Sequence, residues 1–174
     1  MRTIQHVYNN EEGKKINRKS SLNILEIGLG TQNPNAASCM CSQFTVGSSI
    51  RAYKEFFPQS QIYGADIDRD TLFSEDRIQT TYVDQLQPDT FEEMHRVFGS
   101  PSYDIFIEDG LHSFVASLNS LNFALKCTKK GGVIILEDLT NTQNIWSLMT
   151  TALIARGYDA RLIACRGLML VVKL

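Results

Sequence analysis

The sequence lacks the features that mark membrane-spanning and nucleic-acid-binding chains. No apolar stretch approaches the ~20 residues that cross a bilayer, and residues 1–21 contain no apolar signal-peptide core. Like charges never gather in a long run, and the net charge is only −2. We therefore expect neither nucleic acid nor a membrane surface as a partner.

The sequence also has little cysteine, and the cysteines that are present predict a reducing environment. They are Cys39, Cys41, Cys127 and Cys165. The Cys39-x-Cys41 spacing alone is a poor zinc signature, and the other two lie in apolar stretches that are typical of a protein core. This usage favours the cytoplasm.

Length and composition fit one compact domain. The chain has 174 residues, and 43% of them are hydrophobic, which is enough for a substantial core. We predict a polar N-terminal arm over residues 1–21 and a single domain over residues 22–174.

Apolar runs alternate with segments of helical periodicity along this domain. The runs that have the length of buried strands are 23–29, 61–66, 78–83, 103–108 and 133–136. The segments with apolar residues at helical spacing are 49–57, 88–98, the stretch that Ser113 would cap, and 142–156. The last two runs, 160–165 and 168–173, flank Arg166-Gly167 and are typical of a hairpin.

This order predicts an α/β fold: a Rossmann-like, doubly wound sheet of seven strands, mostly parallel, with an antiparallel C-terminal hairpin strand. Residues 70–75 are expected to form a helical turn. Trp146 is expected to pack its helix against the sheet or to line a pocket. The residues that we expect to point inward from the last two helices are Val115, Leu118, Leu121, Leu125, Ile145, Leu148, Met149 and Leu153.

The first strand leads into a glycine-containing turn, Glu26-Ile-Gly28-Leu-Gly30. Glycines at this point let the backbone approach a bound cofactor. Position 33 is Asn where a dinucleotide fingerprint has its third glycine, which weakens a pyrophosphate cradle and hence an NAD site. S-adenosylmethionine carries no phosphate and needs no such cradle. We therefore predict Glu26, Gly28 and Gly30 in an S-adenosylmethionine site.

Acidic residues follow the next two strands. Asp66 ends the second strand, where a carboxylate can accept hydrogen bonds from both ribose hydroxyls. Asp68 is the competing candidate, and Asp84, after the third strand, is expected to border the adenine. Glycine and Asp at strand ends are also common in plain turns. The long segment 30–48 is either a lid over the cofactor or a surface insertion.

Two later runs each end in a carboxylate pair, Glu108-Asp109 and Glu137-Asp138. If they are neighbouring parallel strands, Asp109 and Asp138 emerge about 5 Å apart at the same end of the sheet. Mg²⁺ prefers oxygen ligands and takes one or two carboxylates from a protein. We therefore predict a metal site there, with Glu137 either a third ligand or a structural partner.

His112 follows Asp109 by three residues and would lie over that cation. A metal-bound hydroxyl has a lowered pKa, and an imidazole beside it can accept the proton as a general base. Each residue also has an ordinary interpretation. Asp109 suits a turn, Asp138 suits a helix cap, and His112 suits a loop without a catalytic task.

These motifs resemble those of class I S-adenosylmethionine-dependent methyltransferases. Residues 22–30 resemble the first motif of that class, and residues 62–68 resemble its second-strand motif. Residues 107–112 together with 131–138 resemble, more narrowly, the metal-dependent macrolide-sugar (mycinamicin-type) O-methyltransferases and the related cephalosporin-hydroxylase-like group. The resemblance covers about residues 22–139.

The resemblance implies that Asp109 and Asp138 bind magnesium and that His112 is the base. The chain departs from the family pattern at Glu108, where Asp is frequent, and at Leu111, where Ser is common. It is also shorter than the macrolide enzymes, which leaves glycan, glycolipid or small polyol acceptors open.

The sequence therefore predicts a magnesium-assisted O-methyltransferase that acts on a hydroxyl of a sugar or sugar-containing small molecule, as a possible homo-oligomer. Three alternatives stay open. They are a metal-independent methyltransferase, a non-catalytic cofactor-binding protein, and an NAD-dependent oxidoreductase, which Asn33 disfavours.

Overall fold

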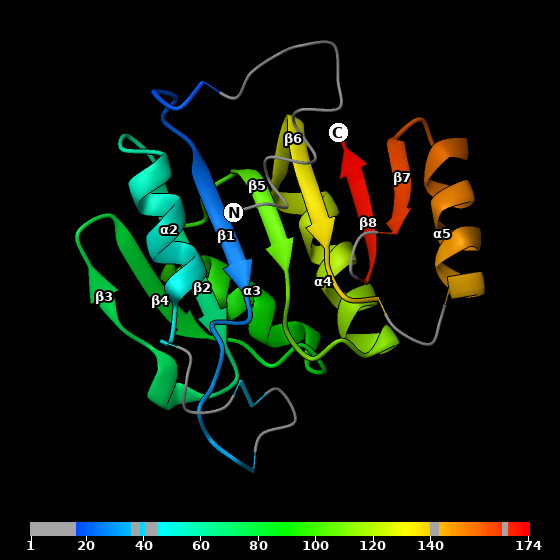
Figure 1. Cartoon of the computed structure of the whole chain (residues 1–174). Helices are drawn as coiled ribbons and strands as arrows, with labels where there is room; N and C mark the ends of the chain where they lie inside the picture. The colour runs from blue at the N-terminus through cyan, green and yellow to red at the C-terminus, as the bar shows by residue number, and fades with distance from the viewer. Residues whose placement is uncertain (1–16, 36–38, 41–44, 140–142, 165–166) are drawn as a thin grey trace.

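The computed structural model describes residues 17–35, 39–40, 45–139, 143–164 and 167–174. Their strands form one eight-stranded sheet in the order β3-β4-β2-β1-β5-β6-β8-β7 (Figure 1). The strands are β1 Asn23–Ile27, β2 Gln61–Asp66, β3 Ser74–Glu75, β4 Ile78–Tyr82, β5 Tyr103–Glu108, β6 Thr128–Leu136, β7 Asp159–Ala164 and β8 Leu168–Lys173. The helices are α2 Ser48–Phe56, α3 Pro88–Val97, α4 Phe114–Cys127 and α5 Gln143–Ala155.

The centre of the sheet is parallel, and its C-terminal part is an antiparallel hairpin. Strands β4, β2, β1, β5 and β6 pair in parallel, whereas β8 is antiparallel to both β6 and β7. The predicted fold class and the terminal hairpin are confirmed. Cys165, which we placed at the end of the first hairpin strand, and Arg166, which we placed in the turn, lie outside the described residues.

The eighth strand corrects the predicted count of seven. Residues 70–75 were expected to form a helical turn, but only Arg69–Thr71 are helical, as a short 3₁₀ turn, and β3 pairs with β4. A two-residue turn joins these strands, with Arg77 at φ 58°. Asp76-Arg77 is not a usual sequence for such a turn, which explains why the pattern did not reveal it.

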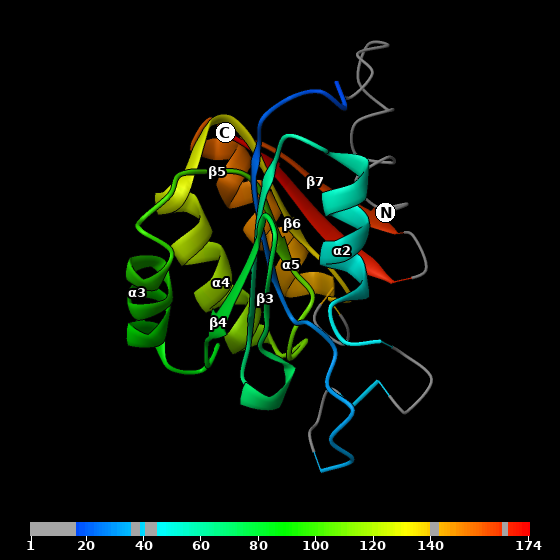
Figure 2. The ribbon, with the colours of Figure 1, turned by 90° about the vertical axis from the view of Figure 1, so that its left-hand side faces the viewer.

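Helices cover the two faces of the sheet unequally. Helix α2 lies on one face, while α3 and α4 lie on the other (Figure 2). Helix α5 joins this second layer, because its Trp146 and Leu153 belong to the same core as the buried residues of α3 and α4. The central strands are apolar on both faces, as expected for a parallel sheet between helices.

The two shorter helices match the prediction. In α2 the buried residues include Ile50 and Tyr53, and Phe57 directly after it is also buried. Helix α3 begins at Pro88, a good first-turn residue, and buries Phe91 and Met94.

The predicted inward faces of α4 and α5 are partly wrong. Val115 is 55% exposed, and the buried face of α4 is built largely from small residues such as Ala116 and Ser120. In α5, Ile145 and Leu148 are 44% and 70% exposed. Trp146 is buried in the core, as its predicted packing role requires, with its ring 5.4 Å from that of Phe114. In α4 the small residues let the helix approach the sheet closely, so its large apolar side chains are a poor guide to its inner face.

Candidate metal and cofactor site

The site lies where three parallel strands end together. In the sheet Ile27 of β1 pairs with Glu108 of β5, which pairs with Leu136 of β6. The ladder continues past the strands, because Asp109 N–H donates to the Ile27 carbonyl at 2.9 Å and Glu137 N–H donates to the Glu108 carbonyl at 2.9 Å. This register brings the segments that follow β1, β5 and β6 to one end of the sheet.

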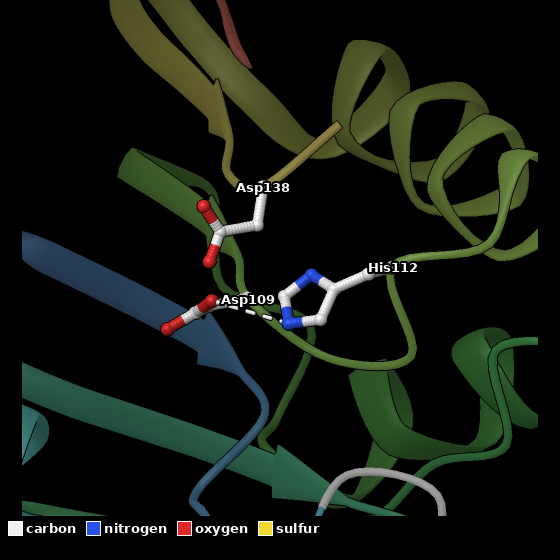
Figure 3. Close-up of side chains that lie close together, drawn as sticks. All are labelled: Asp109, His112 and Asp138. Atoms are coloured by element: carbon white, nitrogen blue, oxygen red, sulfur yellow. Dashed lines mark ion pairs between the residues drawn. The ribbon is translucent and has the colours of Figure 1, made fainter. Parts of the chain in front are cut away.

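Asp109, His112 and Asp138 converge at this end (Figure 3). One ligand atom from each lies within 4.8 Å of the others. Nε2 of His112 is 3.7 Å from Oδ1 of Asp109, and the two side chains are 33% and 43% exposed. The predicted juxtaposition is therefore confirmed, while the roles of the three residues stay predictions.

Two of these residues adopt an unusual backbone conformation. His112 and Asp138 have φ of 54° and 50°, the left-handed region that non-glycine residues seldom occupy. Such residues persist where the surroundings fix them. Ser113, as predicted, caps α4 just after His112, and Leu139 N–H just after Asp138 donates to the Leu168 carbonyl at 2.8 Å.

Negative charge is concentrated around Asp109. Burial, together with the negative charges of Glu137, Glu26 and Asp138, raises the pKa of Asp109 to about 8. A divalent cation between Asp109 and Asp138 would relieve this repulsion, and two carboxylates with open, solvent-facing sides suit Mg²⁺, which keeps several waters. The donor set therefore fits the predicted metal. His112 adds a nitrogen atom to the site. Mg²⁺ prefers oxygen ligands, so an imidazole suits a general base better than a metal ligand here.

Glu26 lies beneath α2. It is 2% exposed, and it accepts hydrogen bonds from Ser49 and Tyr53 of that helix. Burial raises the pKa of Glu26 to about 7, although these hydrogen bonds oppose the rise. Glu26 thus ties β1 to α2 directly below the glycine turn, and its predicted contact with the cofactor stays a prediction.

Gly28 is required by a close approach of two segments. Its φ is 98°, and a Cβ at this position would lie 2.1 Å from the Asp109 carbonyl oxygen. The turn after β1 therefore rests directly on the backbone of the metal segment. Gly30 has φ 80° and faces Met40. We predicted glycines here because they let the backbone approach a ligand. At Gly28 the group that approaches closely is the backbone of Asp109.

Asp66 is 5% exposed, and its carboxylate holds the glycine turn in place. It accepts hydrogen bonds from Leu29 N–H at 2.7 Å and from Asp68 N–H at 2.9 Å. Asp68 in turn accepts from the Thr31 hydroxyl, and Asp84 accepts from Leu86 N–H at 2.9 Å. Because a carboxylate has about four acceptor positions, these contacts leave room for ribose or adenine groups.

The described part of segment 30–48 folds back beside the glycine turn. Thr31 pairs with Cys39, and Met40 N–H donates to the Thr31 carbonyl at 2.9 Å. Residues 36–38 and 41–44 lie outside the described residues, so a lid over the cofactor stays a prediction.

Sequence reasoning missed Gln85. It follows Asp84, is 6% exposed, and forms hydrogen bonds to the segment that carries Asp109 and His112. The only available signal was its position directly after a predicted cofactor residue at the end of a strand.

The antiparallel β8 between β6 and β7, with acidic residues after β2, β5 and β6, defines the methyltransferase form of the Rossmann-like fold. Solved structures agree. This chain is similar to the MycE methyltransferase of the mycinamycin biosynthetic pathway in complex with Mg and SAH, at 25% identity and a TM-score of 0.68 over 90% of this chain and 46% of that one. A second MycE structure, with Mg, SAH and mycinamycin VI, has 23% sequence identity and a TM-score of 0.70. The match covers 88% of this chain and 44% of that one.

Curated relatives confirm the resemblance to macrolide-sugar O-methyltransferases, although no protein-family model matches the chain. Demethylmacrocin O-methyltransferase of Streptomyces fradiae and mycinamicin VI 2''-O-methyltransferase of Micromonospora griseorubida are each 32% identical over 123 residues. A tetracenomycin-C rhamnosyl 2'-O-methyltransferase of Streptomyces olivaceus is 28% identical over 122 residues. These matches cover 70% of this chain but only 28–30% of the relatives, so the matched region spans less than a third of their length.

Substitution of Glu26 by Gln should change how stability depends on pH. Between the ordinary pKa of 4.5 and the folded value of about 7, the folded state keeps a proton that the unfolded state has lost. Ionisation of Glu26 should therefore contribute a fall of ~3 kcal/mol to the free energy of unfolding of the wild type as pH rises through this window. In Glu26→Gln the free energy of unfolding should fall by ~3 kcal/mol less than in the wild type, because Asp109, whose pKa is also raised, lowers the stability of both proteins over this pH range. Urea unfolding at pH 5 and pH 8 measures the difference, and equal falls in both proteins would contradict it.

Substitution of Gly167 by Ala should weaken metal binding specifically. A Cβ there would lie 2.3 Å from Oδ1 of Asp138, which forces that carboxylate to move. We expect the Mg²⁺ affinity to fall by roughly tenfold, with S-adenosylhomocysteine affinity unchanged, as measured by calorimetry. Gly157→Ala is the control. An alanine at position 157, where φ is 91°, is strained but does not contact Asp138. This variant should therefore lose stability and keep its Mg²⁺ affinity. Equal Mg²⁺ affinity of the Gly167→Ala variant and the wild type would refute the contact.

Proposed function

We propose that this chain is a magnesium-assisted, S-adenosylmethionine-dependent O-methyltransferase that acts on a hydroxyl of a sugar or sugar-containing small molecule. The observation that carries the proposal is the convergence of Asp109, Asp138 and His112 beside the glycine turn. The relatives that match the chain are O-methyltransferases by name, one of them for a rhamnosyl tetracenomycin-C, and MycE was solved with Mg and SAH.

Asp109 and Asp138 would hold the cation. When bound, Mg²⁺ lowers the pKa of a hydroxyl that it contacts. His112 would accept the proton of the acceptor hydroxyl at an imidazole nitrogen, because its ring is partly exposed on the open side of the two carboxylates. Removal of that proton makes the oxygen a better nucleophile toward the cofactor's methyl group.

Gly28, Gly30, Asp66 and Asp84 would form the cofactor side of the pocket, with Glu26 supporting the glycine turn from below. We propose that residues 22–174 form this methyltransferase domain and that the acceptor is a small molecule or a glycan. A homo-oligomer and a cytoplasmic location stay predictions. Among the described helices, none has the length and apolar character needed to cross a bilayer.

Asp109→Asn should separate the metal role from the cofactor role. Loss of one of the two carboxylates should lower Mg²⁺ affinity and methyl transfer by roughly 100-fold or more. The affinity for S-adenosylhomocysteine should stay within a few-fold of the wild type, because Asp66 and the glycine turn keep their contacts. Calorimetry with S-adenosylhomocysteine, with and without Mg²⁺, measures both affinities.

Asp159→Asn is the matched control, because it removes a charge at the opposite end of the sheet, where Asp159 pairs in register with Lys173. It should leave both affinities and activity unaltered. Methyl transfer that survives EDTA, or normal turnover by Asp109→Asn, would favour a metal-independent methyltransferase. Tight cofactor binding without transfer to any sugar acceptor would favour a non-catalytic protein.

A further inference from the structure

Gln85 is a buried polar residue between three elements of the site. It follows β4, lies against the end of β5, and contacts α4. Gln85 is only 6% exposed. A buried amide must find hydrogen-bond partners within the protein, since leaving its groups unpaired costs free energy.

The side-chain amide of Gln85 uses both of its ends. Its Oε1 accepts a hydrogen bond from Leu111 N–H at 2.8 Å, in the middle of the Asp109–His112 segment. Its Nε2 donates to Oε1 of Glu108 at 2.7 Å and to the Ser120 hydroxyl of α4 at 2.9 Å. Gln85 therefore links the segment that carries the metal ligand and base to a strand and to a helix.

The neighbouring groups reinforce this arrangement. Oε1 of Glu108, itself fully buried, also accepts from Gly110 N–H at 3.3 Å. Gly110 lies flat against the Gln85 amide, and a Cβ at Gly110 would come within 2.1 Å of Oε1 of Gln85. The carbonyl of Gln85 accepts from Nδ2 of Asn119 at 2.9 Å, which fixes the Gln85 backbone as well.

We propose that Gln85 is a positioning residue that holds the Asp109–His112 segment in the conformation that the metal and base site needs. The proposal rests on the proposed function, and it adds a residue to which that function assigned no task. His112, at φ 54°, lies next to Leu111, whose N–H Gln85 holds. A left-handed residue is strained and persists only where neighbouring contacts fix its conformation, and the hydrogen bond from Leu111 N–H to Gln85 is such a contact.

The same residue connects the two halves of the pocket. Asp84, directly before Gln85, is a proposed cofactor residue, and Asp109 is a proposed metal ligand. A displacement of the segment after β4 would therefore also displace the Asp109–His112 segment, through the hydrogen bond from Leu111 N–H to Gln85. This arrangement predicts that damage to Gln85 affects metal binding and turnover more than cofactor binding.

The test is an exchange of donor and acceptor between Gln85 and Glu108. Gln85→Glu places two carboxylates against each other where the donating amide stood 2.7 Å from Glu108. In the double variant Gln85→Glu with Glu108→Gln, the amide and carboxylate change places, and a hydrogen bond of reversed direction can form. Gln87→Glu, the same change at an exposed position two residues away, is the control.

Two readouts distinguish positioning from plain stabilisation. The first is Mg²⁺ affinity by calorimetry, together with kcat and KM for S-adenosylmethionine. The second is the NMR signal of the His112 imidazole in histidine-labelled protein, with that of His95, which lies beside Tyr103 in the core, as an internal reference. The NMR readout needs neither metal nor acceptor, so it decides the proposal even if the wild type binds no Mg²⁺ and the proposed function fails.

We expect Gln85→Glu to lower Mg²⁺ affinity and kcat by about tenfold, with KM for the cofactor nearly constant. The His112 signal should shift while that of His95 stays in place. The double variant should recover most of the loss. A loss of thermal stability with unaltered Mg²⁺ affinity and His112 signal would overturn the proposal, as would a double variant that recovers nothing. If Gln85→Glu does not fold, Gln85→Met, which leaves Leu111 N–H unpaired, is measured in the same way and should show the same shift.

Discussion

The site depends on the parallel register of β1, β5 and β6. Because Ile27, Glu108 and Leu136 lie level in the sheet, the residues that follow them share one end of it. Backbone hydrogen bonds extend this ladder beyond the strands. They fix the positions of Asp109 and Glu137 independently of any side-chain contact. A shift of one residue in β6 would turn Asp138 away from Asp109 and separate the pair.

The charge around this end of the sheet follows from that register. Glu26, Asp109, Glu137 and Asp138 interact electrostatically, and burial together with this repulsion raises the pKa of Asp109. Folding that brings like charges together is costly unless a proton or a cation joins them. The crowding of carboxylates is thus a physical reason for a metal here, independent of any relative. The Gln85 amide, Gly167 beside Asp138 and the Gly28 turn then hold the three segments against each other.

Much of this arrangement could be predicted, because buried parallel strands are continuous apolar runs and their ends converge. The five central strands, the hairpin and the meeting of Asp109, His112 and Asp138 followed from that pattern. The inner faces of α4 and α5 did not, because small residues such as Ala116 and Ser120 decide how closely α4 packs. The role of Gln85 depends on hydrogen bonds between elements far apart in sequence, which no local pattern encodes.

A crystal structure with Mn²⁺ and S-adenosylhomocysteine tests the account most directly, since the anomalous signal of Mn²⁺ locates the ion without reference to activity. We predict one peak within ~2.2 Å of a carboxylate oxygen of Asp109 and of one from Asp138, with the His112 ring facing the open side of the ion. A peak elsewhere, or none while the cofactor is bound, would contradict the account.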